Sequence, residues 1–308
     1  MAAGKLTADL MLLLKSFSRV NLYCILIILV PLNLVSQTDS VQTLTYPADT
    51  SKTISKGSQH SLFTGVGYGS NLIYLGSTIS QDQQYGHGAL TYGFKNEFYA
   101  TVSAIHLSGL DPFLAFYTGS LNYTHVFNSW IDISAGVSRY QVNSSLADTL
   151  FSNFTYGDLN LGIDWRLIYS KLSVGGLFSD ENQAYFQLRN SRYFQTPEFF
   201  KNKVYVSFDP YVNLLFGTLL KTETSTETSV TIAFPFRKWR LKRQSTPEIT
   251  YSRKFGIMEV DFGLPVALNT DFMTVEAEAN YILPVYEDPD FPGPKGFVFM
   301  LSCSVRIF

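Results

Sequence analysis

Four carboxylates occupy alternate positions in two neighbouring apolar segments near the end of the chain: Glu259, Asp261, Glu276 and Glu278. Side chains two residues apart lie on the same face of a β-strand, so each pair would share a face. If the two segments form a hairpin, Asp261 would lie opposite Glu278, and Glu259 opposite Asn280. Facing like charges destabilise a sheet, so such a site requires cations, water or a shared proton.

Basic residues are expected to balance this acidic group. Arg306, in the last segment, is predicted to lie opposite Glu276, and Asp164 with Arg166 would add a pair from another segment. One interpretation is a cation-attracting wall in a narrow pore, or a site for a proton or a metal ion. The other is the hydrated, salt-bridged filling that narrow barrels contain. No histidine lies in the acidic segments and no metal-ligand spacing occurs, so the sequence predicts neither a metal site nor a cofactor.

The histidines do not form a recognisable catalytic group. A membrane lipid hydrolase would need a nucleophile and a base on its outer wall, which makes His106 with Ser108, or His125, the residues to consider. Alternation places both histidines on the apolar face near its ends, where an amphipathic ring can contact lipid headgroups. No G-x-S-x-G sequence occurs, and Ser103 falls on the opposite face from His106. The sequence therefore predicts no catalytic residue.

A basic segment around one tryptophan lies at 237–247. Its cations are Arg237, Lys238, Arg240, Lys242 and Arg243. One interpretation is contact with lipopolysaccharide phosphates, to which arginine makes charge-assisted hydrogen bonds. The alternatives are capture of an anionic ligand and a solvated charged loop. A second link, 189–203, is also basic and aromatic, and both links are predicted at the outer surface.

The elements that would position these residues are strands with one wholly apolar face. The clearest example is 158–169, where six apolar residues alternate with mostly polar ones. The apolar set is Leu159, Leu161, Ile163, Trp165, Leu167 and Tyr169. The same alternation returns until the last residue, which is typical of a membrane β-barrel with its apolar face toward lipid and its polar face toward the lumen.

Twelve segments show this pattern: 61–80, 85–94, 97–108, 113–127, 131–142, 154–169, 171–188, 203–216, 226–236, 247–268, 272–286 and 296–308. The first is interrupted by glycines and is interpreted as one kinked strand. Short turns at 95–96, 128–129, 170–171, 217–225 and 269–271 alternate with longer links, as periplasmic turns alternate with outer loops in bacterial barrels. The predicted fold is all-β: a transmembrane antiparallel up-and-down barrel of about 12 strands, with both termini on the periplasmic side.

The beginning of the chain predicts export. Residues 1–36 are interpreted as a cleaved signal peptide, because basic residues precede the apolar run 22–30. The alternative is a membrane anchor, but that run is shorter than the ~20 residues of a spanning helix. Residues 37–59 are predicted to be a polar extension and 60–308 the barrel, located in the cell outer membrane.

Composition agrees with this interpretation. The chain is 46% hydrophobic and only 16% charged, with 19 Tyr and 25 Phe, as a barrel with aromatic belts requires. The net charge of −2 gives no reason to expect nucleic-acid binding. The terminal aromatic residue Phe308 is similar to the signal that barrel insertion machinery reads, although it falls on the polar phase of its strand.

Several stretches together resemble a family of outer-membrane β-barrels from the Bacteroidota. These are LIYLGSTISQDQ (72–83), FYATVSAIHLSGLDP (98–112), FGIMEVDFGLPV (255–266) and YILP (281–284), followed by a closing aromatic strand. The resemblance covers about 60–308. It implies the barrel fold and the outer membrane, and it transfers no catalytic residue, because the family has no settled activity.

Three functions are consistent with the sequence. The first is a narrow channel for small solutes or ions, lined by the lumen charges. The second is a structural or surface-interaction barrel whose basic outer loops bind lipopolysaccharide or a partner. The third, a membrane lipid-modifying enzyme, is disfavoured by the missing nucleophile–base pair. The expected partners are outer-membrane lipids and, during assembly, the insertion machinery.

Overall fold

The computed structural model describes residues 59–147, 149–179, 182–200, 203–224, 228–232, 249–286 and 294–308, with backbone only between 220 and 251. The predicted signal segment 1–36 and the extension 37–59, except Gln59, lie outside these residues. The basic segment 237–247 lies outside them as well. Among the described residues, no helix is both long and apolar enough to cross a membrane.

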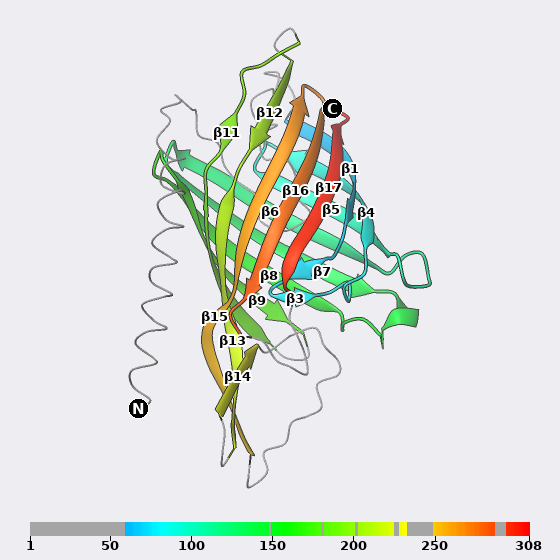
Figure 1. Ribbon diagram of the computed structural model, residues 1–308. Coiled ribbons are helices and arrows are strands. Elements are labelled where there is room, and N and C mark those ends of the chain that lie inside the picture. The colour runs from blue at the N-terminus through cyan, green and yellow to red at the C-terminus, as the bar shows by residue number, and fades with distance from the viewer. Residues whose placement is uncertain are drawn as a thin grey trace. The chain divides into compact units, whose positions relative to one another are not determined.

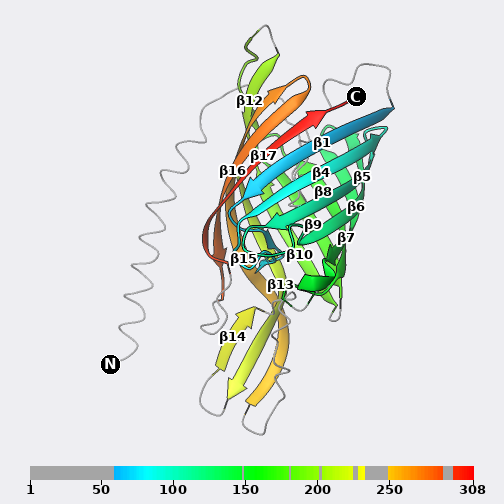
Figure 2. The ribbon, with the colours of Figure 1, turned by 90° about the vertical axis from the view of Figure 1, so that its right-hand side faces the viewer.

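Twelve antiparallel strands form a closed ring (Figures 1 and 2). In ring order they are β1 (His60–Gly69), β4 (Tyr85–Phe94), β5 (Phe98–Leu107), β6 (Phe116–Asn128), β7 (Ile131–Val142), β8 (Phe154–Asp164), β9 (Tyr169–Phe178), β10 (Gln183–Ser191), β13 (Tyr211–Thr224), β15 (Ile249–Thr270), β16 (Met273–Pro284) and β17 (Gly296–Arg306). The ring closes because β1 pairs with β17 while β13 pairs with β15. The predicted all-β antiparallel barrel of about twelve strands is therefore confirmed.

The strand count is right although several predicted strands differ from the observed ones. The segment 203–216 divides into β12 (Val204–Phe208) and the first residues of β13. Two further differences affect the count of ring strands. The segment 171–188, predicted as one strand, contains parts of β9 and β10. In the segment 226–236, predicted as a barrel strand, the described residues form β14 (Thr228–Ile232), which among the described strands pairs with β13 alone and does not join the ring. The two errors cancel in the count.

Short strands extend the sheet beyond the ring. β14 lies beside the last residues of β13, which there pair with 249–256 of β15 (Figure 2). At the other end of β15, β12 (Val204–Phe208) pairs with 266–270, and β11 (Phe194–Gln195) pairs with β12. The predicted turn at 217–225 is wrong, because β13 continues through it to Thr224.

The connections define two ends of the barrel. The turn end has the short connections 95–97, 129–130, 165–168 and 271–272, the start of β1 and the end of β17. The loop end has the connections 70–84, 108–115, 143–153 and 285–295, and a 3₁₀ turn at Ser144–Leu146. The link that follows β10 lies at the turn end, so the prediction that 189–202 is an outer loop is wrong.

The outward face of the ring is apolar. The alternation predicts that seven residues on four strands face lipid. Of these, Leu161, Phe262, Phe299 and Leu301 are exposed, and Ile163, Val260 and Val275 are half-buried in phase with them. Exposed aromatic side chains gather toward the two ends. Near the turn end they are Phe98, Phe127, Trp130, Trp165 and Phe272, and near the loop end Tyr68, Phe113, Tyr117, Phe178 and Phe297. Such a band between two aromatic belts is the surface that a membrane barrel presents.

The alternation in 158–169 ends earlier than predicted. β8 stops at Asp164, and 165–168 form an exposed turn in which Arg166 has a positive φ of 69°. Tyr169 begins β9 with its side chain buried, and its hydroxyl donates to Asp132 (3.1 Å to Oδ2). The predictions that Tyr169 faces lipid and that 170–171 form a turn are therefore wrong, because the faces change phase across the turn at 165–168.

A bulge in β15 changes the phase of that strand as well. The register between β13 and β15 shifts between Leu215 and Phe216, so that Met258 is an extra residue on β15. A bulge turns the side chains on either side of it in different directions. The alternation in 247–268 predicts Met258 on the apolar outer face together with Val260 and Phe262. That prediction is wrong, because Met258 is 0% exposed and lies inside, whereas Ile257 faces outward.

The first predicted strand, 61–80, is also wrong beyond Gly69. β1 stops there, and the chain turns into the barrel. Gly67 and Gly69 face inward, where a Cβ would lie only 2.2 Å from the ring of His87 and 2.3 Å from that of Tyr85. These glycines therefore provide room for the two rings on β4 and do not form a kink within a longer strand.

Candidate functional site

Residues 71–83, here called the lumen hairpin, form a compact unit held by its own hydrogen bonds. Strands β2 (Ile73–Tyr74) and β3 (Ser77–Thr78) pair at its centre. The side chain of Asn71 accepts hydrogen bonds from Thr78 Oγ1 and Ser80 Oγ, both at 2.7 Å, and donates one to Asp82 Oδ1 at 2.7 Å. Because these hydrogen bonds join residues of the hairpin to one another, the hairpin folds as an insert and does not continue the wall.

The lumen hairpin reaches across the inside of the ring. Tyr74 packs on inward-facing rings of β7 and β8, with centroid distances of 5.2 Å to Tyr140 and 5.6 Å to Tyr156. At the tip, Gly76 has a φ of +75°, and a Cβ there would lie 3.3 Å from Leu215 of β13 and 3.4 Å from Met258 of β15. The hairpin therefore contacts two separate parts of the wall, β7 and β8 on one side and β13 and β15 on the other, with β9 and β10 between them.

An apolar core surrounds the hairpin inside the barrel. It contains Leu75 and Ile79 of the hairpin with buried wall residues that include Ile105, Phe116 and Leu177. Phe151 and Leu150, from the connection between β7 and β8, complete it. The lumen is therefore filled by apolar packing toward the loop end, where the sequence predicted a polar interior.

Three of the four predicted carboxylates lie together on the inner wall. Glu259 and Asp261 are each 3% exposed, and their side chains approach closely enough to interact. Asn213 Nδ2 donates to Asp261 Oδ2 at 3.0 Å. Tyr211 Oη donates to Glu278 Oε1 at 2.6 Å. Glu276 is half-buried one position further toward the turn end on the same face.

The predicted cross-strand pairing of these carboxylates is wrong. Asp261 pairs with Ile282, and Glu278 pairs with Pro265. The reason is the tight connection at 271–272, which pairs Asn269 with Thr274 and thereby shifts β16 by four residues from the predicted register. The carboxylates share the inner face because side-chain alternation survives an even shift.

Arg306 does not face Glu276. The Cα partner of Glu276 on β17 is Ser302, and Arg306 lies four residues further toward the turn end. There its backbone N–H donates to Phe272 O at 2.7 Å. Arg166 is not in the lumen either, since it lies in the exposed turn after Asp164, where its backbone N–H donates to Asp164 Oδ1 at 2.6 Å. Both predictions are therefore wrong: Arg306 does not lie opposite Glu276, and Arg166 does not line the lumen.

A different arginine lies beside the acidic wall. The backbone register connects one residue from each of six neighbouring strands in a single row: Asp132, Gly162, Lys171, Arg189, Asn213 and Asp261. Four of these residues have buried polar side chains, Arg189 is half-buried, and Gly162 is buried but has no side chain. The Arg189 guanidinium carbon lies 3.6 Å from the Tyr211 ring centroid, and its charge acts on Asp261 and Glu276.

Sequence reasoning missed Arg189 because the predicted strand stopped at residue 188. A signal for it was present: Gln183, Tyr185, Gln187 and Arg189 alternate with more apolar residues, which is the pattern of an inward face.

We expect Arg189→Met to lower the free energy of unfolding by roughly 2 kcal/mol or more, because it removes the cation–π contact and leaves nearby carboxylates uncompensated. Urea unfolding of vesicle-reconstituted protein measures the effect. Arg306→Met is the matched control and should cost less. An equal or larger loss for Arg306→Met would show that Arg306 balances the wall after all.

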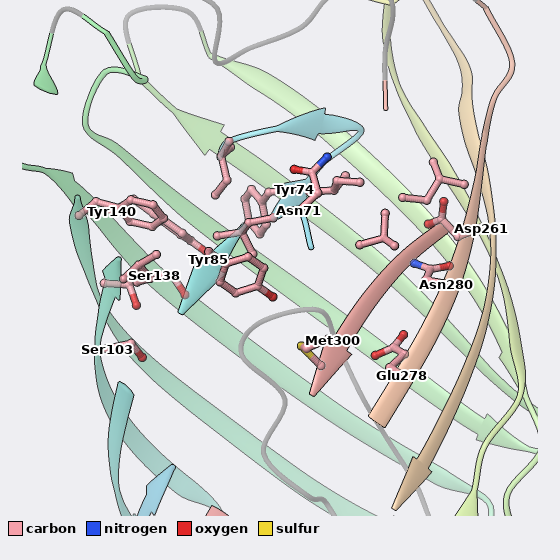
Figure 3. A pocket seen from close by; sticks show the side chains of 18 of the residues that line it. Asn71, Tyr74, Tyr85, Ser103, Ser138, Tyr140, Asp261, Glu278, Asn280 and Met300 are labelled. Carbon is pink, nitrogen blue, oxygen red and sulfur yellow. The ribbon is translucent and has the colours of Figure 1, made fainter. Parts of the chain in front are cut away.

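A cavity of about 150 Å³ lies between the lumen hairpin and the acidic wall. Figure 3 shows Tyr74, Tyr85 and Tyr140 on one side of it, and Asp261, Glu278 and Asn280 on the other. Ser103, Thr118, Ser120 and Ser138 contribute hydroxyl groups. Among the described residues, no group of three or more His, Cys, Asp or Glu side chains is arranged to hold a metal ion.

The outward histidines have structural partners at the ends of the barrel. His106 stacks on Phe113 at 4.5 Å, and its Nδ1 lies 2.7 Å from Phe113 O. His125 Nδ1 lies 2.8 Å from Glu97 Oε1, and the His125 ring packs beside that of Phe127. These contacts are those of belt residues, and neither pairs the histidine with a serine.

The fold and the site define a closed antiparallel β-barrel whose lumen holds an inserted hairpin and a buried acidic wall. No family model matches the sequence, and no curated protein is similar to it. No comparison therefore tests the predicted resemblance to a Bacteroidota family, which stays a prediction.

Several solved structures are similar in arrangement at very low identity. LpxR from Salmonella typhimurium has 5% identity and a TM-score of 0.45, covering 80% of this chain and 99% of that one. A NanC porin has 8% identity and a TM-score of 0.43, covering 79% and 98%. An outer membrane channel from Pseudomonas putida F1 has 13% identity and a TM-score of 0.42, covering 82% and 100%. At these values, the similarity transfers no activity to this chain.

Proposed function

We propose that this protein is an integral outer-membrane barrel, delivered by the N-terminal segment 1–36. The support is the apolar outward band between two aromatic belts, together with the closed ring, which leaves no unpaired backbone edge in lipid. The short connections would face the periplasm, as in bacterial barrels, and the loop end would face outward.

We propose further that the barrel is a narrow channel closed by the lumen hairpin. The single observation that supports this most is that the segment blocking the lumen belongs to a connection between strands and is bonded mainly to itself. Its movement would therefore break few wall hydrogen bonds. On the turn-end side of the hairpin, buried polar side chains and carboxylates line the interior of the barrel. Twelve strands enclose more space than the small filled barrels of eight, which leaves room for a passage.

Conductance across planar bilayers tests this channel. Wild-type protein should show rare, small openings. A variant in which a short Gly-Ser linker replaces 72–82 should conduct continuously, because the apolar obstruction is gone. Gly76→Val should raise the open frequency, since a β-branched residue is strained at positive φ and would press on Leu215 and Met258. The control Phe113→Ser, outside the lumen, should behave as wild type.

Folding of each variant is verified by heat-modifiable gel mobility. A folded excision variant that stays electrically silent would refute the channel and leave a structural or surface-interaction role.

The second candidate is such a surface role, and one observation favours it. Residues 217–224 of β13, 249–257 of β15 and β14 continue the sheet past the loop end of the ring. The basic segment 237–247 connects these strands. Replacing its five cations with glutamine should weaken binding to lipopolysaccharide micelles and reduce the salt dependence of that binding. Unchanged binding in a folded variant would exclude this segment as the contact.

A further inference from the structure

We propose that the cavity between the lumen hairpin and the acidic wall binds a small organic cation that carries N–H donors, an alkylammonium or guanidinium group. As the solute class of the channel, this inference rests on the proposed function. Binding itself, however, can be measured in a barrel that does not conduct.

The charge of the cavity favours a cation. Among the described residues that line it, three are carboxylates, Glu259, Asp261 and Glu278, and none is lysine, arginine or histidine. Arg189 acts on Asp261 from β10, on the far side of β13, and does not line the cavity. Arg189 compensates only part of this charge, since one guanidinium acts from outside the cavity on a wall of three carboxylates. Burying the remaining negative charge is costly, so a bound positive charge would stabilise this wall.

The hydrogen-bonding capacity of the wall narrows the ligand class. Glu259 Oε2, Asp261 Oδ1 and Asn280 Oδ1 are buried and receive no hydrogen bond from the described residues, apart from the one that Glu259 and Asp261 make with each other when either holds a proton. Asn280 is 7% exposed, and its side chain lies beside Asp261 and Glu278 at the cavity (Figure 3). Even with that shared proton, Asn280 Oδ1 has no donor and the wall presents more acceptors than donors, which suits a group that only donates. Ammonium and guanidinium are such groups, since they have several N–H donors and no acceptor.

The opposite wall suits the same ligand. Tyr74, Tyr85 and Tyr140 are buried there, and the rings of Tyr74 and Tyr140 lie 5.2 Å apart. The faces of aromatic rings attract cations and accommodate a short alkyl chain. The cavity of about 150 Å³ has space for on the order of ten water molecules, and therefore for a cation of a few heavy atoms.

Isothermal titration calorimetry of the purified full-length barrel with ethylammonium chloride tests the proposal. Ethanol, a neutral molecule of similar size, and tetramethylammonium, a cation without N–H groups, are the comparison ligands. We expect ethylammonium to bind, ethanol not to bind, and tetramethylammonium to bind at least about tenfold more weakly. Equal affinity for tetramethylammonium, or absence of ethylammonium binding to the folded wild type, would overturn the proposal.

Matched variants locate the site. Asp261→Asn should reduce ethylammonium affinity at least about tenfold. Asn280→Leu changes no charge and should also reduce ethylammonium affinity. If Asp261→Asn does not fold, the affinity of Asn280→Leu decides whether ethylammonium binds at this cavity. Asp132→Asn is the control, because Asp132 is another buried lumen carboxylate but does not line the cavity. An Asp132→Asn loss as large as that of Asp261→Asn would show a general effect of lumen charge and refute the site.

This readout separates the two proposals. Ethylammonium binding without conductance in the hairpin-excision variant would refute the channel and retain the site. Conductance without binding would retain the channel and refute the site.

Discussion

Replacing Phe154 with alanine is expected to lower the free energy of unfolding by roughly 3–5 kcal/mol, the usual cost of removing a large aromatic side chain from a close-packed core. Phe154 is 0% exposed, and its ring stacks on Tyr140 at 4.3 Å and lies 5.4 Å from that of Phe151. The loss would show that the loop end of the lumen is dry and packed. Urea unfolding in lipid vesicles, followed by gel mobility, provides the measurement.

Leu159→Ala is the matched control on the same strand. Its side chain faces outward, so the substitution removes apolar surface without leaving a cavity, because lipid fills the space. Its cost should be limited to the transfer of the lost methylene groups, roughly 2 kcal/mol. If Phe154→Ala cost no more than this control, the interior would be loosely packed or wet, and the hairpin would not be held by an apolar core.

A charge on the outward face should be costly in the middle of the barrel. Leu301 is the central residue of β17 and is 52% exposed. Leu301→Arg should therefore lower the free energy of unfolding by roughly 2–4 kcal/mol, the value for arginine at the bilayer midplane. The same unfolding assay, performed in vesicles, measures this loss.

The inward neighbour provides the test of orientation. Ser302 lies one residue further along β17, and its Cα partner on β16 is Glu276. Ser302→Arg should cost clearly less than Leu301→Arg, because the new cation would face a carboxylate in the polar interior. Equal losses for the two variants would mean that the faces of β17 have been assigned wrongly.

The faces of the strands could be predicted from the sequence, because alternation depends only on local geometry. Leu161, Phe299 and Leu301 are outward as their phase indicates. The ends of the strands were harder to predict. The connection between β9 and β10, 179–182, has an even number of residues, so the inward phase of Leu177 continues at Gln183 and the pattern runs through the turn unbroken. No periodicity could reveal that turn, although its composition, Ser-Asp-Glu-Asn, is typical of one.

The sequence predicts which carboxylates share the inner wall, but it does not predict which residues lie opposite them on the neighbouring strands. Glu259, Asp261 and Glu278 were found by phase, but their neighbours depend on register, and register depends on the turn at 271–272 and the bulge at Met258. Neither is visible in alternation. The lumen hairpin was mistaken for a strand because its apolar residues serve an interior core, and composition alone does not distinguish a core residue from a lipid-facing one. Arg189 was assigned to a loop because the predicted strand ended at residue 188, whereas β10 continues to Ser191.

The pairing of β1 with β17 also has a consequence for how the barrel forms. It joins His60–Gly69 to Gly296–Arg306, the two ends of the described sheet, so nearly the whole ring must be arranged before this seam can close. Contacts between residues so far apart in sequence form slowly, since the chain loses much entropy before they stabilise it. Until then, β1 and β17 each present an unpaired edge, which other chains could join. We therefore expect seam closure to limit the rate of assembly, and an open sheet with two reactive edges to be the species that most needs protection.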